Sequence, residues 1–265
     1  MTEAQLSTRE GSRGEIAVYR WPNPDATHRV LLAHGYGEHL GRYDHVAAAL
    51  LANGAEVVGP DHLGHGRSAG ERVLVGSFDD VLADLRAVAK TAGTDLPVAL
   101  VGHSLGGMIA ARYAQLHGAE LTALVLSGPV LGSWAPVALA DGEIPDEPLD
   151  VSTLSRDPAV GRRYEADPLI WHGPYKRTML RAIGRCLDEI NAGPRLTPPT
   201  LWLHGAADRL VPIGPSRAGI ERIRGERFEQ ISYPGAEHEI FNETNNAEVL
   251  ADATSFIRRS LPVRS

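Results

Sequence analysis

Short apolar runs alternate with amphipathic stretches along the first half of the chain. Such runs predict buried strands, and apolar positions at helical spacing predict helices. We predict strands at residues 15–21, 29–33, 55–59, 97–101 and 121–126, the first of them half-exposed. We predict helices between them at residues 43–52, 78–91 and 108–114. Strands that alternate with helices are typical of an α/β fold, in which a mostly parallel sheet has helices on both faces.

This alternation stops at about residue 130, and no run of strand-forming residues follows until residue 197. The intervening region holds an acidic, proline-containing stretch, a short segment and a longer helix, at residues 141–150, 157–165 and 174–191. Two more strands and a final amphipathic helix follow at residues 200–203, 228–233 and 246–259. We therefore predict a core made of residues 1–130 and 197–265, with residues 131–196 inserted as a helical cap.

One predicted strand leads directly into the motif GHSLG at residues 102–106 and then into a helix. A strand, a tight turn and a helix form the context in which a G-x-S-x-G motif exposes a nucleophilic serine, here Ser104. A second match at residues 66–70 lacks both flanking elements, so we interpret Ser68 as a loop serine. The alternative for Ser104 is a helix N-cap, a position that serine often occupies.

A serine nucleophile needs a histidine base, which in turn needs a carboxylate to orient it. When the serine lies on such a turn, the acid and then the histidine follow later in the chain. Asp208 follows the strand predicted at 200–203, and His238 follows the strand predicted at 228–233. We predict that Ser104, Asp208 and His238 form a catalytic triad. The alternatives are an Asx-turn residue for Asp208 and a surface-loop histidine for His238.

Acyl transfer also requires N–H donors for the negative charge that develops on the substrate oxygen. One predicted donor is the N–H of Leu105, which follows the serine at the start of a helix. The other is Tyr36, in the glycine-containing loop HGYG that follows the first buried strand. The glycines of this loop have turn formation as an alternative role. We interpret His103 and residues 61–68 as structural.

Composition narrows the class of protein. Hydrophobic residues make up 43% of the 265 residues, which is enough for a sizeable core. The net charge of −7, without a basic run, argues against a nucleic-acid partner. The single Cys186 excludes an internal disulfide and fits a reducing compartment. We find no secretory signal, no membrane-spanning run and no zinc motif, so we expect a cytoplasmic protein without a metal or another cofactor.

Assembled in this way, the chain resembles the α/β-hydrolase superfamily and, within it, the monoacylglycerol lipase and lysophospholipase group. The matching stretches span nearly the whole chain: HGYGEHLGRYDHVA (34–47), PDHLGHGRSAGERV (60–73), VGHSLGG (101–107), STLSRDP (152–158), Tyr164 with DPL (167–169), HGAADRLVP (204–212) and YPGAEHEIFNE (233–243). The resemblance implies the α/β-hydrolase fold, the triad named above, and oxyanion donors at Tyr36 and Leu105. It also implies that Glu38 and Arg42 help to hold the glycerol-like end of the substrate, with a solvated-loop role as the alternative.

The predicted cap departs from the pattern of this group, whose members usually carry a longer apolar first cap helix that meets the lipid surface. Here residues 131–150 form a short and acidic stretch, and only residues 134–140 are apolar enough to dock on a lipid surface. We therefore expect at most peripheral membrane contact through the cap, and a monomer or a weak dimer.

The resemblance implies a serine ester hydrolase that cleaves monoacylglycerols or similar small acyl esters through an acyl-enzyme. The same triad would also serve a general carboxylesterase, a lysophospholipase, or a hydrolase of carbon–carbon bonds. A non-catalytic binding protein of this fold usually lacks a triad member, whereas all three are present here. Epoxide hydrolysis and dehalogenation are disfavoured, because those relatives have aspartate where Ser104 stands.

Overall fold

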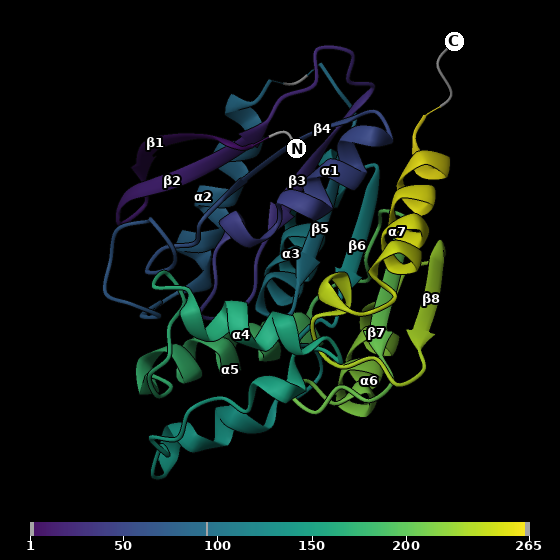
Figure 1. Ribbon diagram of the computed structural model, residues 1–265. Helices are drawn as coiled ribbons and strands as arrows, with labels where there is room; N and C mark the ends of the chain where they lie inside the picture. The colour runs from purple at the N-terminus through teal and green to yellow at the C-terminus, as the bar shows by residue number, and fades with distance from the viewer. Residues whose placement is uncertain (1–2, 94, 263–265) are drawn as a thin grey trace.

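A computed structural model describes residues 3–93 and 95–262 of the chain. Within these residues the chain forms one sheet of eight strands, which has helices on both sides (Figure 1). The strands are β1 (Gln5–Gly11), β2 (Gly14–Trp21), β3 (His28–Ala33), β4 (Ala55–Pro60), β5 (Val98–His103), β6 (Ala123–Ser127), β7 (Thr200–Gly205) and β8 (Phe228–Tyr233). Their order across the sheet is β1-β2-β4-β3-β5-β6-β7-β8.

Most of the strand pairs are parallel. β2 pairs antiparallel with β1 and with β4, whereas the pairs from β4 through β3 and β5 to β8 are all parallel. The mostly parallel sheet predicted from the sequence is therefore confirmed. β1 was not predicted, because its residues QLSTREG are polar and mostly exposed and carry no apolar pattern.

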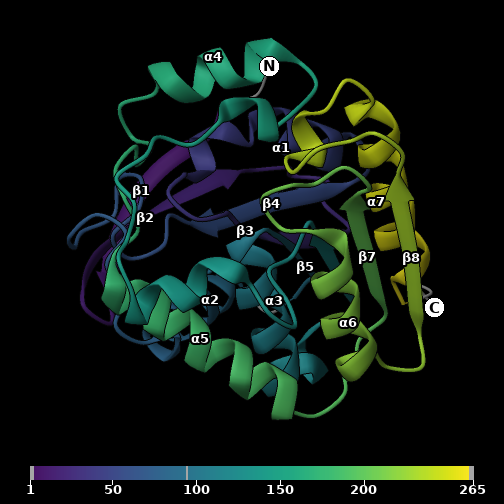
Figure 2. The same cartoon turned by 90° about the horizontal axis from the view of Figure 1, so that it is seen from below.

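Helices cover both faces of the sheet. The α-helices are α1 (Asp44–Ala52), α2 (Phe78–Thr91), α3 (Leu105–His117), α4 (Pro158–Ala166), α5 (Arg177–Ala192), α6 (Ile213–Ile223) and α7 (Asn246–Ser260). The short 3₁₀ helices are η1 (Leu40–Arg42), η2 (Gly118–Glu120), η3 (Ala135–Asp141), η4 (Val151–Thr153) and η5 (Ile240–Asn242). Figure 2 shows α1 and α7 on one side of the strands and α2, α3 and α6 on the other.

Alternate side chains of the central strands pack into two separate cores. In β3, Leu31 and Ala33 pack with α2 and α3, whereas Val30 and Leu32 pack with α1 and α7. This alternation follows from the strand period of two, and it explains why the central parallel strands, which are buried on both faces, are mostly apolar.

The helix predicted at residues 78–91 has these bounds in the structure, as α2. Its start is fixed by Ser77, whose hydroxyl accepts a hydrogen bond from the Asp79 N–H at 3.2 Å. The next helix, α3, begins three residues earlier than the prediction of 108–114, because the turn at Ser104 leads into it directly.

In the part of the chain that the structure describes, the regular elements between β6 and β7 are all helical. They are η3, η4, α4 and α5. This segment lies beyond the carboxyl ends of the parallel strands, below the sheet in Figure 1. Figure 2 shows α4 on the side of α1 and α5 on the side of α2 and α3. Leu180, Ile183 and Leu187 of α5 join the core that α2 and α3 form, so this part of the segment is packed onto the helix layer.

None of the described helices is both long enough and apolar enough to cross a membrane.

Candidate active site

Ser104 lies on a sharp turn between β5 and α3. Its backbone has a φ of 55° and a ψ of −117°, a conformation that residues other than glycine rarely adopt. A Cβ on Gly102 would collide with the carbonyl oxygen of Gly106, and a Cβ on Gly106 would collide with that of Ala33. Ser104 occupies the N-cap position of α3, but its side chain makes no capping hydrogen bond to the helix. The glycines thus allow a strained turn that presents the serine hydroxyl.

The side chains of Ser104, His238 and Asp208 form a continuous hydrogen-bonded row. His238 Nε2 lies 2.8 Å from Ser104 Oγ, and His238 Nδ1 lies 2.7 Å from Asp208 Oδ2. All three residues are buried, and they follow β5, β8 and β7 at one edge of the sheet. The structure therefore brings together the three side chains that the sequence analysis grouped.

The two carboxylate oxygens of Asp208 have different partners. Oδ1 accepts hydrogen bonds from the N–H groups of Leu210 and Val211, at 3.0 and 2.9 Å. Oδ2 faces His238 and also lies 3.3 Å from Nε2 of His204. Burial disfavours the charged carboxylate, but the two histidines outweigh burial and hold the pKa of Asp208 well below its ordinary value. Asp208 therefore both forms the turn and contacts the imidazole.

The surroundings of His238 favour its charged form. Burial lowers the pKa of His238, but the carboxylate of Asp208, assisted by Glu239 and Glu38, outweighs burial and raises that pKa above its ordinary value. The ring of His103 stands 4.9 Å from the ring of His238. Burial lowers the pKa of His103 to about 4, so His103 is neutral at neutral pH. The ionised groups next to His238 are therefore carboxylates.

His103 and the loop after β4 make structural contacts. His103 Nδ1 lies 3.1 Å from both the carbonyl oxygen and the hydroxyl of Ser127. The Ser68 hydroxyl donates to the carbonyl oxygen of Asp61 at 2.6 Å and accepts from the N–H of Ala17 at 3.0 Å. Ser68 is thus a loop serine, as the sequence analysis interpreted it.

The N–H groups of Tyr36 and Leu105 lie on the two turns next to the serine. Leu105 is the first residue of α3, where an N–H has no acceptor within its own helix. The loop of Tyr36 approaches the serine closely, since a Cβ on Gly35 would lie 3.2 Å from the Cβ of Ser104. The Gly35 N–H itself donates to Glu38 Oε1 at 2.7 Å. The N–H groups of Tyr36 and Leu105 therefore lie just beyond the carboxyl ends of β3 and β5.

Glu38 is buried and Arg42 is partly buried, and both are bound to protein groups. Glu38 Oε1 also accepts from the Tyr43 hydroxyl at 2.7 Å, and Glu38 Oε2 accepts from Arg42 Nη1 at 2.6 Å. Arg42 donates in addition to both carboxylate oxygens of Glu239, each at 2.8 Å. Sequence reasoning missed Glu239. The signal that could have indicated it is a carboxylate directly after the histidine, in the stretch HEIFNE.

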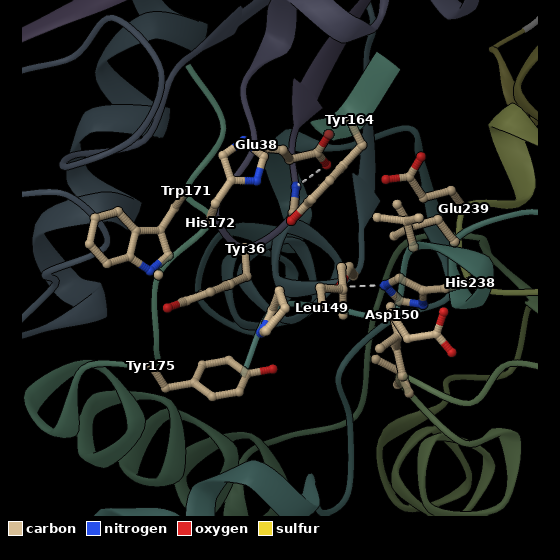
Figure 3. Close-up of a pocket in the computed structure, with 18 of the residues that line it drawn as sticks. Tyr36, Glu38, Leu149, Asp150, Tyr164, Trp171, His172, Tyr175, His238 and Glu239 are labelled. Carbon is tan, nitrogen blue, oxygen red and sulfur yellow. Dashed lines mark hydrogen bonds between the residues drawn. The ribbon is translucent and has the colours of Figure 1, made fainter. Parts of the chain in front are cut away.

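A cavity of about 480 Å³ lies over Ser104 and His238 (Figure 3). This volume is within the range typical of small-molecule sites. Aromatic and aliphatic side chains form much of its wall: Tyr36, Trp134, Leu139, Leu149, Val151, Leu154, Tyr164, Trp171, Tyr175, Leu210 and Val211. Charged side chains also contribute: Glu38, Arg42, Glu147, Asp150, Glu165 and Glu239. The cavity thus suits a ligand with an apolar part and a polar part.

Much of this wall comes from the segment between β6 and β7. The N–H of Trp171 donates to the carbonyl oxygen of Gly37 at 2.8 Å, which joins this segment to the loop after β3. Trp134, in the stretch expected to dock on a lipid surface, is itself buried. Its ring packs edge-on against Tyr175 at 5.6 Å, and its Nε1 donates to the carbonyl oxygen of Leu210 at 3.0 Å. Trp134 therefore contributes to the cavity wall.

The sheet order, the two helix layers and the serine turn at the carboxyl edge define an α/β hydrolase. Comparison with known proteins gives the family. The family model described as serine aminopeptidase, S33, matches residues 24–245, and the chain belongs to this family.

Two similar relatives are named as lipases that act on monoacylglycerols. The monoacylglycerol lipase of Mycolicibacterium smegmatis is 40% identical, over 93% of this chain and 94% of its own. The monoglyceride lipase of Rattus norvegicus is 35% identical, over 87% of this chain and 82% of its own. The resemblance to the monoacylglycerol lipase group is therefore confirmed. The chain is a serine hydrolase of the carboxylic ester class, although the family description refers to a peptidase.

Solved structures agree with this fold. The monoacylglycerol lipase of Paleococcus ferrophilus has a TM-score of 0.83 at 27% identity, covering 93% of this chain and 99% of that chain. A soluble variant of the monoglyceride lipase of Saccharomyces cerevisiae has the same fold, with a TM-score of 0.87 at 21% identity. The match covers 99% of this chain and 97% of that chain.

Proposed function

We propose that this protein hydrolyses monoacylglycerols or similar small acyl esters to a fatty acid and an alcohol. The observation that carries the proposal is the hydrogen-bonded row of Ser104, His238 and Asp208 below a largely apolar cavity. The substrate class is supported by the names of the relatives from Mycolicibacterium smegmatis and Rattus norvegicus.

In the proposed mechanism, Nε2 of His238 accepts the Ser104 proton while Oγ attacks the ester carbonyl carbon. Asp208 accepts a hydrogen bond from Nδ1, which leaves Nε2 as the base and stabilises the imidazolium that forms. The N–H groups of Tyr36 and Leu105 donate to the oxyanion. His238 then protonates the departing alcohol oxygen, and the acyl group stays on Ser104. Water, deprotonated by the same imidazole, releases the fatty acid and restores the serine.

Glu38 and Arg42 are proposed to hold the glycerol end of the substrate, since both line the cavity. Glu38 Oε2 accepts one hydrogen bond from the protein, from Arg42, and a carboxylate oxygen has a second lone pair for a glycerol hydroxyl. The Arg42 guanidinium donates towards two carboxylates, so its part in binding is to keep these acceptors in place.

Contact with a lipid surface is proposed to be at most peripheral, through residues 134–140. Trp134 is buried, and within η3 the half-exposed Val137 and Leu139 offer the apolar surface for such contact. We also propose that the protein acts as a monomer or a weak dimer, without nucleic acid.

Replacement of Ser104 tests the nucleophile. We expect Ser104→Ala to lower kcat/KM for monoacylglycerol hydrolysis by roughly 10⁴- to 10⁶-fold while the unfolding temperature stays near that of the wild type. A fluorophosphonate probe should label the wild type at Ser104 and leave the variant unlabelled. Near-normal turnover by a folded Ser104→Ala protein would refute the assignment.

A substrate panel tests the reaction. Purified enzyme is assayed with monoacylglycerols of several acyl lengths, simple carboxylic esters, lysophospholipids and a ring-opened aromatic product with a cleavable carbon–carbon bond. We expect the highest kcat/KM among the monoacylglycerols. A preference for the substrate with the carbon–carbon bond would overturn the proposed reaction. It would leave the assignment of the triad intact, because the fluorophosphonate probe labels Ser104 whether the enzyme cleaves esters or carbon–carbon bonds.

A further inference from the structure

Three largely buried charged side chains join two loops of the active site. Arg42 Nη1 lies 2.6 Å from Glu38 Oε2 and 2.8 Å from Glu239 Oε1, and Arg42 Nη2 lies 2.8 Å from Glu239 Oε2. The exposed fractions of the Arg42, Glu38 and Glu239 side chains are 12%, 5% and 6%. The carboxylates of Glu38 and Glu239 lie on the same side of the cavity in Figure 3. A bidentate, buried guanidinium–carboxylate pair has a well-defined geometry, so these three residues form a rigid clamp.

One side of the clamp holds the loop after β3. Glu38 accepts hydrogen bonds from the Gly35 N–H and the Tyr43 hydroxyl, both at 2.7 Å. Gly35 directly precedes Tyr36, whose N–H is the proposed oxyanion donor. The position of the Glu38 carboxylate therefore sets the course of the backbone next to that donor.

The other side of the clamp holds the loop after β8. Glu239 directly follows His238, and its N–H donates to the carbonyl oxygen of Leu154 at 2.7 Å. Its Oε2 also accepts from Asn242 Nδ2 at 2.8 Å. Both the backbone and the side chain of Glu239 are thus fixed, and a shift of its carboxylate would be transmitted to His238.

We propose that Arg42 and Glu239 are positioning residues, which hold the loop of the oxyanion donor and the loop of the base at the spacing that catalysis requires. The inference rests on the proposed triad mechanism and goes beyond the glycerol contact. A clamp between the two loops acts on every ester substrate, whatever its alcohol, whereas a glycerol contact acts only on glycerol esters. Because an error of about 1 Å in the position of a catalytic group can lower a rate roughly 100-fold, such a clamp has a measurable effect on kcat.

The clamp also adds charge beside the base. Two carboxylates and one guanidinium leave a net negative charge, and His238 is faced in addition by Asp208 and by the neutral ring of His103. Burial raises the pKa of Glu239, but Arg42 outweighs burial and holds that pKa at about 2, so Glu239 is ionised whenever the enzyme is active. Removal of the Glu239 charge should therefore lower the pKa of His238.

The test uses Arg42→Lys and Glu239→Gln with p-nitrophenyl butyrate, an ester without glycerol. We expect Arg42→Lys, which loses the two-pronged contact, to lower kcat about 10- to 100-fold. We expect Glu239→Gln to move the acid limb of the kcat/KM profile to lower pH by roughly half a unit, because a neutral His238 then persists at lower pH. Glu221→Gln is the matched control. It removes one carboxylate from an exposed ion pair with Arg224 at the C-terminal end of α6, and it should change neither quantity.

The outcomes separate the clamp from the triad. If Ser104→Ala keeps its activity in the same assay, the proposed function fails. If Ser104→Ala is inactive but both clamp variants have the wild-type kcat and acid limb with p-nitrophenyl butyrate, the clamp proposal is overturned and the glycerol contact remains. Glu239→Gln keeps the shape of the side chain and one acceptor oxygen for Arg42. The pH of its acid limb does not depend on the fraction of folded enzyme, so this variant gives a result even if Arg42→Lys fails to fold.

Discussion

The two carboxylate oxygens of Asp208 bind different groups: one binds the backbone of its own turn and the other binds the imidazole of His238. Oδ1 holds the N–H groups of Leu210 and Val211, and this contact keeps the loop in shape whether or not the side chain is charged. Oδ2 fixes the tautomer of His238. The two tasks can therefore be separated by a substitution that keeps one oxygen and replaces the other with an amide.

Asp208→Asn is that substitution. Its remaining oxygen can still accept from the turn, while its amide donates to Nδ1 and forces the proton of His238 onto Nε2, where it blocks the base. We expect kcat to fall about 10³- to 10⁴-fold with little change in unfolding temperature. Loss of the negative charge also lowers the pKa of His238, so the residual activity should have its acid limb at lower pH than the wild type. A rate within tenfold of the wild type would contradict the role of Asp208.

At the scale of the elements, the approach of α3 to β3 places the start of α3 at the cavity. Gly106 permits this approach, because its Cα faces the carbonyl oxygens of Ala33 and His34. A methyl group there would push the helix away from the strand and move the N–H of Leu105.

We therefore expect Gly106→Ala to lower the free energy of unfolding by about 2–3 kcal/mol and to lower kcat/KM at least about tenfold. The control is Gly214→Ala in α6, where a Cβ meets no atom within 4 Å and alanine favours the helix. That variant should match the wild type in activity and be equally or slightly more stable in urea unfolding. Equal behaviour of the two variants would show that the close approach is unimportant.

The same elements show what local sequence determines. The bounds of α2 were predictable because Ser77 caps it and its apolar stripe is regular. The serine turn was predictable because its glycines and its flanking strand and helix are contiguous in the chain. For Asp208 and His238, their places after two late strands were sufficient, since parallel strands end at one edge of the sheet.

Other features depend on contacts between distant segments. Glu239 takes part in the site through Arg42, which lies 197 positions away in the chain, so no local pattern marks it. Trp134 lies in the stretch that the sequence marks as apolar enough to dock on a lipid surface, and the ring of Tyr175, from another part of the same segment, packs against it. β1 is held at the sheet edge by backbone pairing with β2, which polar residues can make as well as apolar ones.

At the scale of the whole molecule, the edge of the sheet that carries the site is also where buried histidines gather. His34 directly follows β3 and lies beside His62 and His65, and the rings of His34 and His62 stand 4.0 Å apart. Burial lowers the pKa of His62 to about 3 and that of His65 to about 4, and it holds the pKa of His34 well below its ordinary value. These rings stay neutral in the folded protein, while the unfolded chain protonates them near pH 6.5.

This difference predicts an enzyme that loses stability as the pH falls below about 6.5, because the unfolded state then binds more protons than the folded state. The raised pKa of His238 has the opposite effect and stabilises the folded protein as the pH falls. It is a single group, however, whereas four deeply buried rings, the three of the cluster and His103, have lowered pKa values. Each ring contributes ~1.4 kcal/mol per pH unit to the slope of the unfolding free energy against pH, between its unfolded and folded pKa values.

The test is urea unfolding of the wild type and of His65→Gln between pH 5 and pH 7. The free energy of unfolding of His65→Gln should depend less steeply on pH, because about one proton fewer is taken up on unfolding, even if that variant is less stable throughout. His172→Gln, which removes an exposed ring, should keep the wild-type slope. Equal slopes for the wild type and His65→Gln would mean that the cluster does not govern the loss of stability in acid.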